Sequence, residues 1–151
     1  MPIKKNPYLC KRMGRMMAID YGTKRTGLAV SDTMQIIAGG LTTVPSVEVV
    51  DFICGYTSRE KVDVFVVGLP LQMNNEPSNH MRYVQAFVDR LRKAFPDIPV
   101  EYYDERFTSV IAHRATIDGG LRKKQRQNKA LIDEISATII LQDYIEKKRN
   151  M

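Results

Sequence analysis

The sequence contains few of the residues that hold zinc or form covalent cross-links. Its 151 residues include two cysteines, Cys10 and Cys54, and two histidines, His80 and His113. The cysteines have neither metal-ligand nor redox spacing, and the histidines stand apart, so a zinc-binding cluster is not indicated. Because no disulfide framework is evident, we expect a reducing compartment and predict a cytoplasmic location.

Long apolar segments are also missing. No run approaches the roughly 20 apolar residues that a membrane helix needs, so we expect no membrane partner. Apolar residues still make up 44% of the chain, enough for the core of one domain of ordinary size. Residues 1–15 are basic and have no apolar stretch of the signal-peptide kind. We predict a disordered basic leader there, with a nucleic-acid-binding arm as the alternative, and one domain over residues 16–151.

The pattern of apolar residues predicts a mixed α/β domain. Strands are predicted at residues 15–21, 26–31, 36–44, 64–67 and 100–103. Helices are predicted from Ser46 as N-cap to about Lys61, over 78–95, from Thr108 or Ser109 to about Gly119, and over about 129–148. Short turns between the first three strands indicate an antiparallel meander, and the continuous apolar run 64–67 is typical of a buried central strand. Together these elements predict a five-stranded mixed sheet with helices on both faces.

Four acidic residues stand at the ends of these elements. Asp20 ends the first predicted strand, Asp104 and Glu105 follow the last one, and Asp133 lies near the start of the final helix. The ends of strands are where an open α/β sheet builds a site. Converging carboxylates repel one another unless a cation neutralises them, and Mg²⁺ or Mn²⁺ suits oxygen ligands. The pattern therefore indicates a divalent-metal site.

Each acid also has an ordinary structural interpretation. Asp20 can be a turn residue, Asp104 can cap a following helix, and Asp133 can be a first-turn acid that the helix dipole favours. Asp133 is the strongest candidate, because apolar residues surround it in the sequence and an inward-facing charge is costly unless something neutralises it.

Four segments in a fixed order carry a resemblance to a known family. They are Ala18 to Asp32 (AIDYGTKRTGLAVSD), Val66 to Pro70 (VVGLP), Asp104 to Ser109 (DERFTS), and Ile132 to Ala137 (IDEISA) with Ile140 and Leu141. Together they resemble the YqgF family, also called RuvX-like Holliday junction resolvases, whose members are assigned to pre-16S ribosomal RNA maturation. The resemblance covers about Met16 to Ile145, nearly all of the chain after the leader.

This resemblance implies a ribonuclease H-like fold and a metal-dependent endonuclease of structured nucleic acid, using Mg²⁺ or Mn²⁺. Carried over by motif, the catalytic residues are Asp20, Glu105 and Asp133, with Asp104 as a further metal ligand. Between the neighbouring acids we favour Glu105, since successive strand side chains point apart. The expected role is processing of the 5′ end of pre-16S rRNA. A Holliday junction resolvase and a non-catalytic RNA-binding assembly factor are the alternatives.

The basic residues suit a nucleic-acid partner. The formal charge is +6, from 23 Lys and Arg against 17 Asp and Glu, although many basic proteins bind no nucleic acid. Predicted phosphate contacts are Lys24, Arg25, Arg106, Arg122, Lys123, Lys124 and Arg126. Tyr8, Tyr102 and Tyr103 could stack on bases, although the last two fit better as sheet residues. The chain could be a monomer or a homodimer, and junction cutting would need a symmetric dimer.

Overall fold

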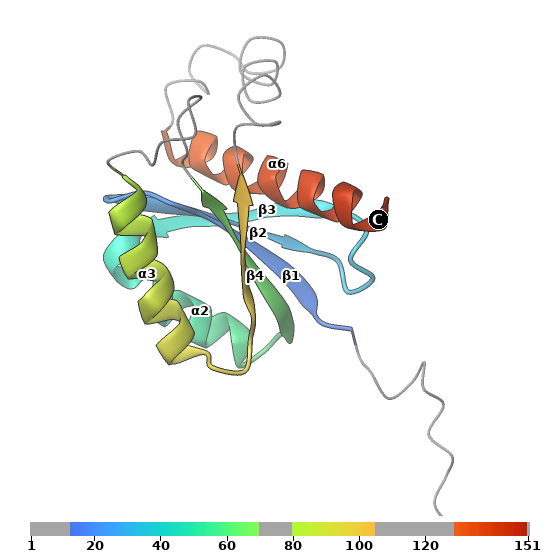
Figure 1. Ribbon diagram of the computed structural model, residues 1–151, viewed down its shortest axis with the longest axis horizontal. Coiled ribbons are helices and arrows are strands. Elements are labelled where there is room, and N and C mark those ends of the chain that lie inside the picture. Colours follow the sequence, from blue (N-terminus) through green and yellow to red (C-terminus); the bar gives the residue numbers. More distant parts are fainter. Residues whose placement is uncertain (1–12, 70–79, 105–128, 151) are drawn as a thin grey trace, which may run out of the picture.

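The computed structural model describes residues 13–69, 80–104 and 129–150 (Figure 1). Its elements, in chain order, are β1 (Arg15–Tyr21), β2 (Arg25–Ser31), β3 (Ala38–Pro45), the 3₁₀ turn η1 (Ser46–Glu48), α2 (Val49–Thr57), β4 (Val62–Leu69), α3 (Met81–Ala94), β5 (Val100–Asp104) and α6 (Lys129–Arg149). The leader residues 1–12 and the helix predicted after Thr108 lie outside the described residues.

The strands form one five-stranded sheet in the order β3-β2-β1-β4-β5. The first three strands make antiparallel pairs, whereas β4 pairs in parallel with both β1 and β5. The predicted mixed sheet and antiparallel meander are confirmed. Because β1, β4 and β5 run in the same direction, their carboxyl ends lie side by side at one end of the sheet. The antiparallel strand β2 begins at that same end.

Helices cover both faces of the sheet, as predicted. Figure 1 shows α2 and α3 on one face and the long helix α6 on the other. Alternate side chains of β1 pack on the two faces of the sheet. Met17 and Ile19 pack against α2 and α3, on what we call the α2/α3 face, and Met16 and Ala18 pack under α6, on the α6 face. The same period of two assigns Asp20 to the α6 face and Tyr21 to the α2/α3 face.

Three predicted boundaries were wrong, two of them for identifiable reasons. The third strand begins at Ala38 rather than at Ile36, because the Asp32 carboxylate accepts hydrogen bonds from the backbone N–H groups of Ile36 and Ile37. Ser46 does not cap a helix: it is the buried first residue of the turn η1, whose N-cap is Pro45, and the N-cap of α2 is Glu48. The α-helix that follows ends at Thr57, short of the predicted Lys61.

Two glycines let α6 lie directly on the sheet. A Cβ atom built on Gly27 of β2 would collide with the carbonyl oxygen of Asp133, and one built on Gly40 of β3 would collide with the side chain of Glu134. The obstacle at Gly27 is backbone, which cannot rotate away as a side chain can. Residue 27 must therefore lack a side chain if the start of α6 is to keep its place.

We predict that Gly27→Ala destabilises the protein by about 1–3 kcal/mol, the usual range for an overpacked core position, because α6 must move away from β2. Urea unfolding monitored by circular dichroism measures this loss. Gly55→Ala is the matched control: nothing lies within 4 Å of its added Cβ atom, and alanine in a helix should stabilise by up to about 1 kcal/mol. A Gly27→Ala protein as stable as the wild type would contradict the close packing of α6.

Candidate active site

Asp20 and Asp133 lie at the same corner of the sheet. In the β1–β2 ladder, Asp20 is the direct partner of Gly27, and such antiparallel partners have Cα atoms about 5 Å apart. The backbone of Asp133 rests on that same Gly27. Since Asp20 belongs to the face that α6 covers, the fold brings together two acids that are far apart in the sequence.

Arg25 supplies the positive charge at this corner. Its Nε donates a hydrogen bond to Oδ2 of Asp133 over 2.9 Å, and the two side chains are 39% and 26% exposed. A pair this accessible contributes at most about 1 kcal/mol to stability. Arg25 was predicted to bind phosphate; in the structure it neutralises a predicted metal ligand, and its remaining guanidinium N–H groups can still donate to an anion.

The end of β5 brings a third acid to the same edge of the sheet, but on the other face. Tyr103 packs under α6, whereas Val100 packs in the α2/α3 layer. By alternation, Asp104 falls on the α2/α3 face, opposite to Asp20, and two strands away at roughly 10 Å. Asp104 is therefore badly placed to share a cation with Asp20.

Most of the other predicted site residues cannot be placed. Glu105, Arg106, Arg122, Lys123, Lys124 and Arg126 lie outside the described residues. Within the part of the chain that the structure describes, no group of three or more acidic, histidine or cysteine side chains is arranged to hold a metal ion. The described corner consists of Asp20, Asp133 and Arg25, with Lys24 exposed in the adjoining turn.

The turn that carries Lys24 and Arg25 is anchored by Ser46. The Ser46 hydroxyl donates to the carbonyl oxygen of Gly22 and is hydrogen-bonded to Thr26 Oγ1 over 2.8 Å. The backbone N–H of Ser46 donates to the Lys24 carbonyl oxygen over 3.0 Å. The prediction of a capping role missed this function. The sequence contained one sign against a capping role, since Val49 stands at the position where a capping box has Glu or Gln.

The end of β1 is also held from α3. His80, the residue before α3, approaches the carbonyl oxygen of Tyr21 with Nε2 at 2.8 Å. The Tyr21 ring stacks on Phe87 of α3, with centroids 4.4 Å apart. The residue that follows Asp20 is thus fixed by both a hydrogen bond and a ring contact, which limits how far Asp20 itself can move.

Two residues named in the sequence analysis, Asp32 of the first family segment and the stacking candidate Tyr103, have structural roles away from this corner. Asp32 follows the opposite end of β2, where the N–H groups of Ile37 and Ile36 donate to its carboxylate and hold its pKa below the ordinary value. Tyr103 is buried under α6 and donates a hydrogen bond to Asp143. It is therefore a sheet residue and not a surface for bases, while Tyr102 is 38% exposed.

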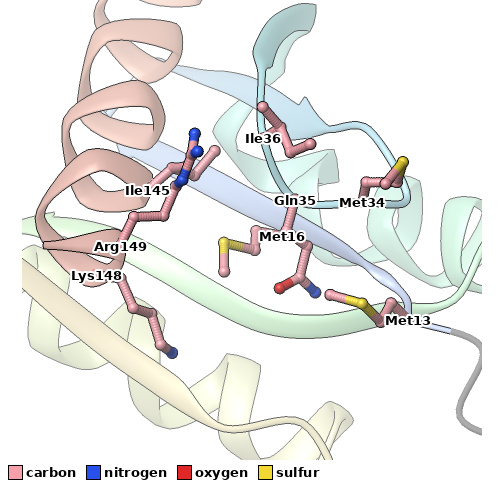
Figure 2. Close-up of a pocket in the computed structure, with 8 residues that line it drawn as sticks. All are labelled: Met13, Met16, Met34, Gln35, Ile36, Ile145, Lys148 and Arg149. Atoms are coloured by element: carbon pink, nitrogen blue, oxygen red, sulfur yellow. The ribbon is translucent and has the colours of Figure 1, made fainter. Parts of the chain in front are cut away.

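A groove of about 300 Å³ lies at the other end of β1 (Figure 2). Met16 and Ile145 contribute to its apolar lining, and Lys148 and Arg149 come from the last turn of α6. Asp20 is at the opposite end of β1, and Asp133 is at the opposite end of α6. The groove is therefore separate from the acidic corner and takes no part in it.

The chain is similar to a family of nucleic-acid enzymes over almost its whole length. A family model described as "RuvX: Holliday junction resolvase" matches residues 14–147. A protein of Parabacteroides distasonis named "Putative pre-16S rRNA nuclease" is 64% identical over 137 residues, 91% of this chain and 98% of the relative. A Porphyromonas gingivalis protein with the same name is 55% identical over 134 residues, which cover 89% and 97% of the two chains.

Solved structures give the fold. Thermus thermophilus RuvC in complex with a Holliday junction substrate superimposes with a TM-score of 0.55 at 17% identity, covering 90% of this chain and 96% of RuvC. A second Thermus thermophilus RuvC structure gives a TM-score of 0.51 at 14% identity. The predicted ribonuclease H-like architecture is confirmed. No helix in the described part of the chain is long and apolar enough to span a membrane.

Removing the Ser46 hydroxyl should loosen the turn beside the acidic corner. In Ser46→Ala, the Gly22 carbonyl and the Thr26 hydroxyl lose a buried partner, so we predict a loss of about 1–3 kcal/mol in the free energy of unfolding. Ser58→Ala is the control, because that hydroxyl is exposed and only bonds its own helix, to the carbonyl oxygen of Gly55. Equal stability of the two variants in urea titrations would show that Ser46 does not anchor the turn.

Proposed function

The chain belongs to the RuvX family of Holliday junction resolvases, and on that premise we propose that it is a metal-dependent endonuclease that processes the 5′ end of pre-16S rRNA. The names of the similar proteins from Parabacteroides and Porphyromonas support the RNA substrate. One observation carries the proposed chemistry: Asp20 is the cross-strand partner of Gly27, and the backbone of Asp133 packs against the same glycine.

The residues at the acidic corner fit a hard divalent cation. Asp20 and Asp133 offer carboxylate oxygens, which are the ligands that Mg²⁺ and Mn²⁺ prefer. The Asp133 carboxylate is paired with one cationic group, the Arg25 guanidinium, in a partly exposed ion pair. A bound ion would activate water and stabilise the leaving oxygen of a phosphodiester.

We propose Glu105, and not Asp104, as the third ligand. The described part of β5 gives Asp104 the α2/α3 face, opposite to Asp20, and Glu105 is the neighbouring acid in the sequence. Glutamate also has a longer side chain than aspartate, and one strand, β4, separates β5 from β1.

Arg25 has two roles in this proposal. Without a metal ion, it balances the charge of Asp133. Its planar fork is also well suited to donate to the phosphate being cut, while the carboxylates of Asp20 and Asp133 would hold the divalent ion. Lys24, exposed in the same turn, adds a second positive charge. We propose Arg106, Arg122, Lys123, Lys124 and Arg126 as further phosphate contacts.

Resolution of a Holliday junction is the second candidate. It is favoured by the family description and by the fold shared with RuvC in complex with a junction. Cutting a junction symmetrically needs two copies of the site in a dimer, whereas trimming an RNA end needs one. The two substrates therefore distinguish the candidates, and a third outcome, binding without cutting in either metal, would identify a non-catalytic assembly factor.

We predict that Asp20→Asn, Glu105→Gln and Asp133→Asn each reduce the rate of cleavage of a precursor 16S rRNA end at least about 100-fold. Each variant removes a proposed ligand of the metal ion, and such an ion lowers the energy of the transition state by several kcal/mol. Cleavage is measured in Mg²⁺ and in Mn²⁺, with EDTA as the blank and a four-way DNA junction as the parallel substrate.

Two acid-to-amide variants are the controls for this series. Asp104→Asn tests the choice between neighbouring acids, and Asp51→Asn changes an exposed carboxylate on α2, which covers the opposite face of the sheet from α6. Both should cut nearly as well as the wild type. Full activity in a folded Asp133→Asn protein would remove that residue from the site, and loss of activity in Asp104→Asn alone would reverse the choice of ligand.

A further inference from the structure

A row of stacked aromatic rings leads from the core to the surface beside the end of β1. The buried ring of Phe87 stacks on Tyr21, and Tyr21 stacks on His80 with centroids 6.3 Å apart. His80 in turn lies 6.0 Å from the ring of Tyr83. Tyr83 is the outermost member and is 43% exposed. The other three rings hold this outermost ring in a defined place on α3.

The surface around these rings is positively charged. The guanidinium of Arg82 lies 4.9 Å from the centroid of the Tyr83 ring. Arg90 lies 5.9 Å from the Phe87 ring and donates a hydrogen bond to the Tyr21 hydroxyl. Over its whole length, α3 carries four basic residues and one acid, Asp89. An exposed ring among arginines is suited to a flat anionic ligand such as a nucleotide.

The aromatic row and the acidic corner flank the end of the same strand. Asp20 and Tyr21 are consecutive residues of β1 and belong to opposite faces of the sheet. The two features therefore lie on opposite faces of the sheet at the end of one strand, and Tyr83 is two ring contacts, of 6.3 and 6.0 Å, beyond Tyr21. A nucleic-acid strand that passes over the end of β1 could contact both features.

We propose that Tyr83 is a stacking platform for an unpaired base of the substrate, on the strand that is cut. This inference rests on the proposed nuclease function and extends it, because it assigns a single-stranded flank to the preferred substrate. A base inside a continuous duplex is covered on both sides and cannot stack on a side chain, so the platform favours a strand that leaves the duplex near the cleavage point.

The test measures binding in EDTA, where no cleavage can occur. The probes are short RNA duplexes with a 5′ or a 3′ single-stranded overhang that contains 2-aminopurine, and a blunt duplex of the same sequence. Tyr83→Ala should weaken binding of one overhang duplex about fivefold or more and reduce the fluorescence quenching of its 2-aminopurine. Blunt-duplex affinity and the salt dependence of binding should stay unchanged, because no charge is removed.

Two further variants separate stacking from other causes. Tyr83→Phe keeps the ring and loses only the hydroxyl, which accepts a hydrogen bond from Arg82, so it should bind like the wild type. Arg82→Gln removes a charge and should flatten the salt dependence. The inference would be overturned if Tyr83→Ala bound both overhang duplexes as tightly as the wild type does. It would also be overturned if Tyr83→Ala lost as much affinity for the blunt duplex as for an overhang duplex.

The binding test of Tyr83 can fail or succeed separately from the cleavage test of the acid variants. Asp20→Asn should bind the overhang duplex with normal quenching, since it leaves the aromatic row intact. If Tyr83→Ala binds normally while the acid variants lose cleavage, the platform is wrong and the nuclease stands. If the acid variants keep cleavage while Tyr83→Ala loses the overhang, the platform stands without the proposed metal site.

Discussion

The close approach of α6 to β2 is the constraint on which the acidic corner depends. At Gly27, the backbone of the helix rests directly on the backbone of the strand, and no side chain can fit between them. This contact places Asp133 beside the cross-strand partner of Asp20. The first acid belongs to the first strand and the second to the last helix, so the site exists only when the whole sheet has formed and α6 has docked on it.

Charge balance is the second requirement of such a site. Two carboxylates at one corner destabilise the folded protein unless positive charge compensates them. Arg25 provides this charge at Asp133 through a partly exposed ion pair, which is weak enough for a stronger ligand to displace. Ser46 and Thr26 hold the turn from which Arg25 projects. In the proposed site, this balance would let the corner stay folded without a metal ion and would leave both carboxylates available to one.

Much of this arrangement could be predicted from the sequence, because alternation and apolar runs directly report strands and buried faces. The meander, the buried strand β4 and the long final helix follow from such patterns. Tertiary hydrogen bonds could not be predicted in this way. Ser46 has the composition of a helix cap but is used to hold a turn, and Asp32 binds the backbone that was expected to start β3. The Arg25–Asp133 pair joins residues that no local pattern relates.

The shared cation pocket is tested most directly by diffraction from crystals of the protein soaked in Mn²⁺, with anomalous scattering to locate the ion. We predict an anomalous peak bounded by the carboxylates of Asp20 and Asp133, with the Arg25 guanidinium displaced from its present contact at 2.9 Å. An intact Arg25–Asp133 pair with manganese bound elsewhere, or not at all, would contradict the proposal that these two acids hold the catalytic metal.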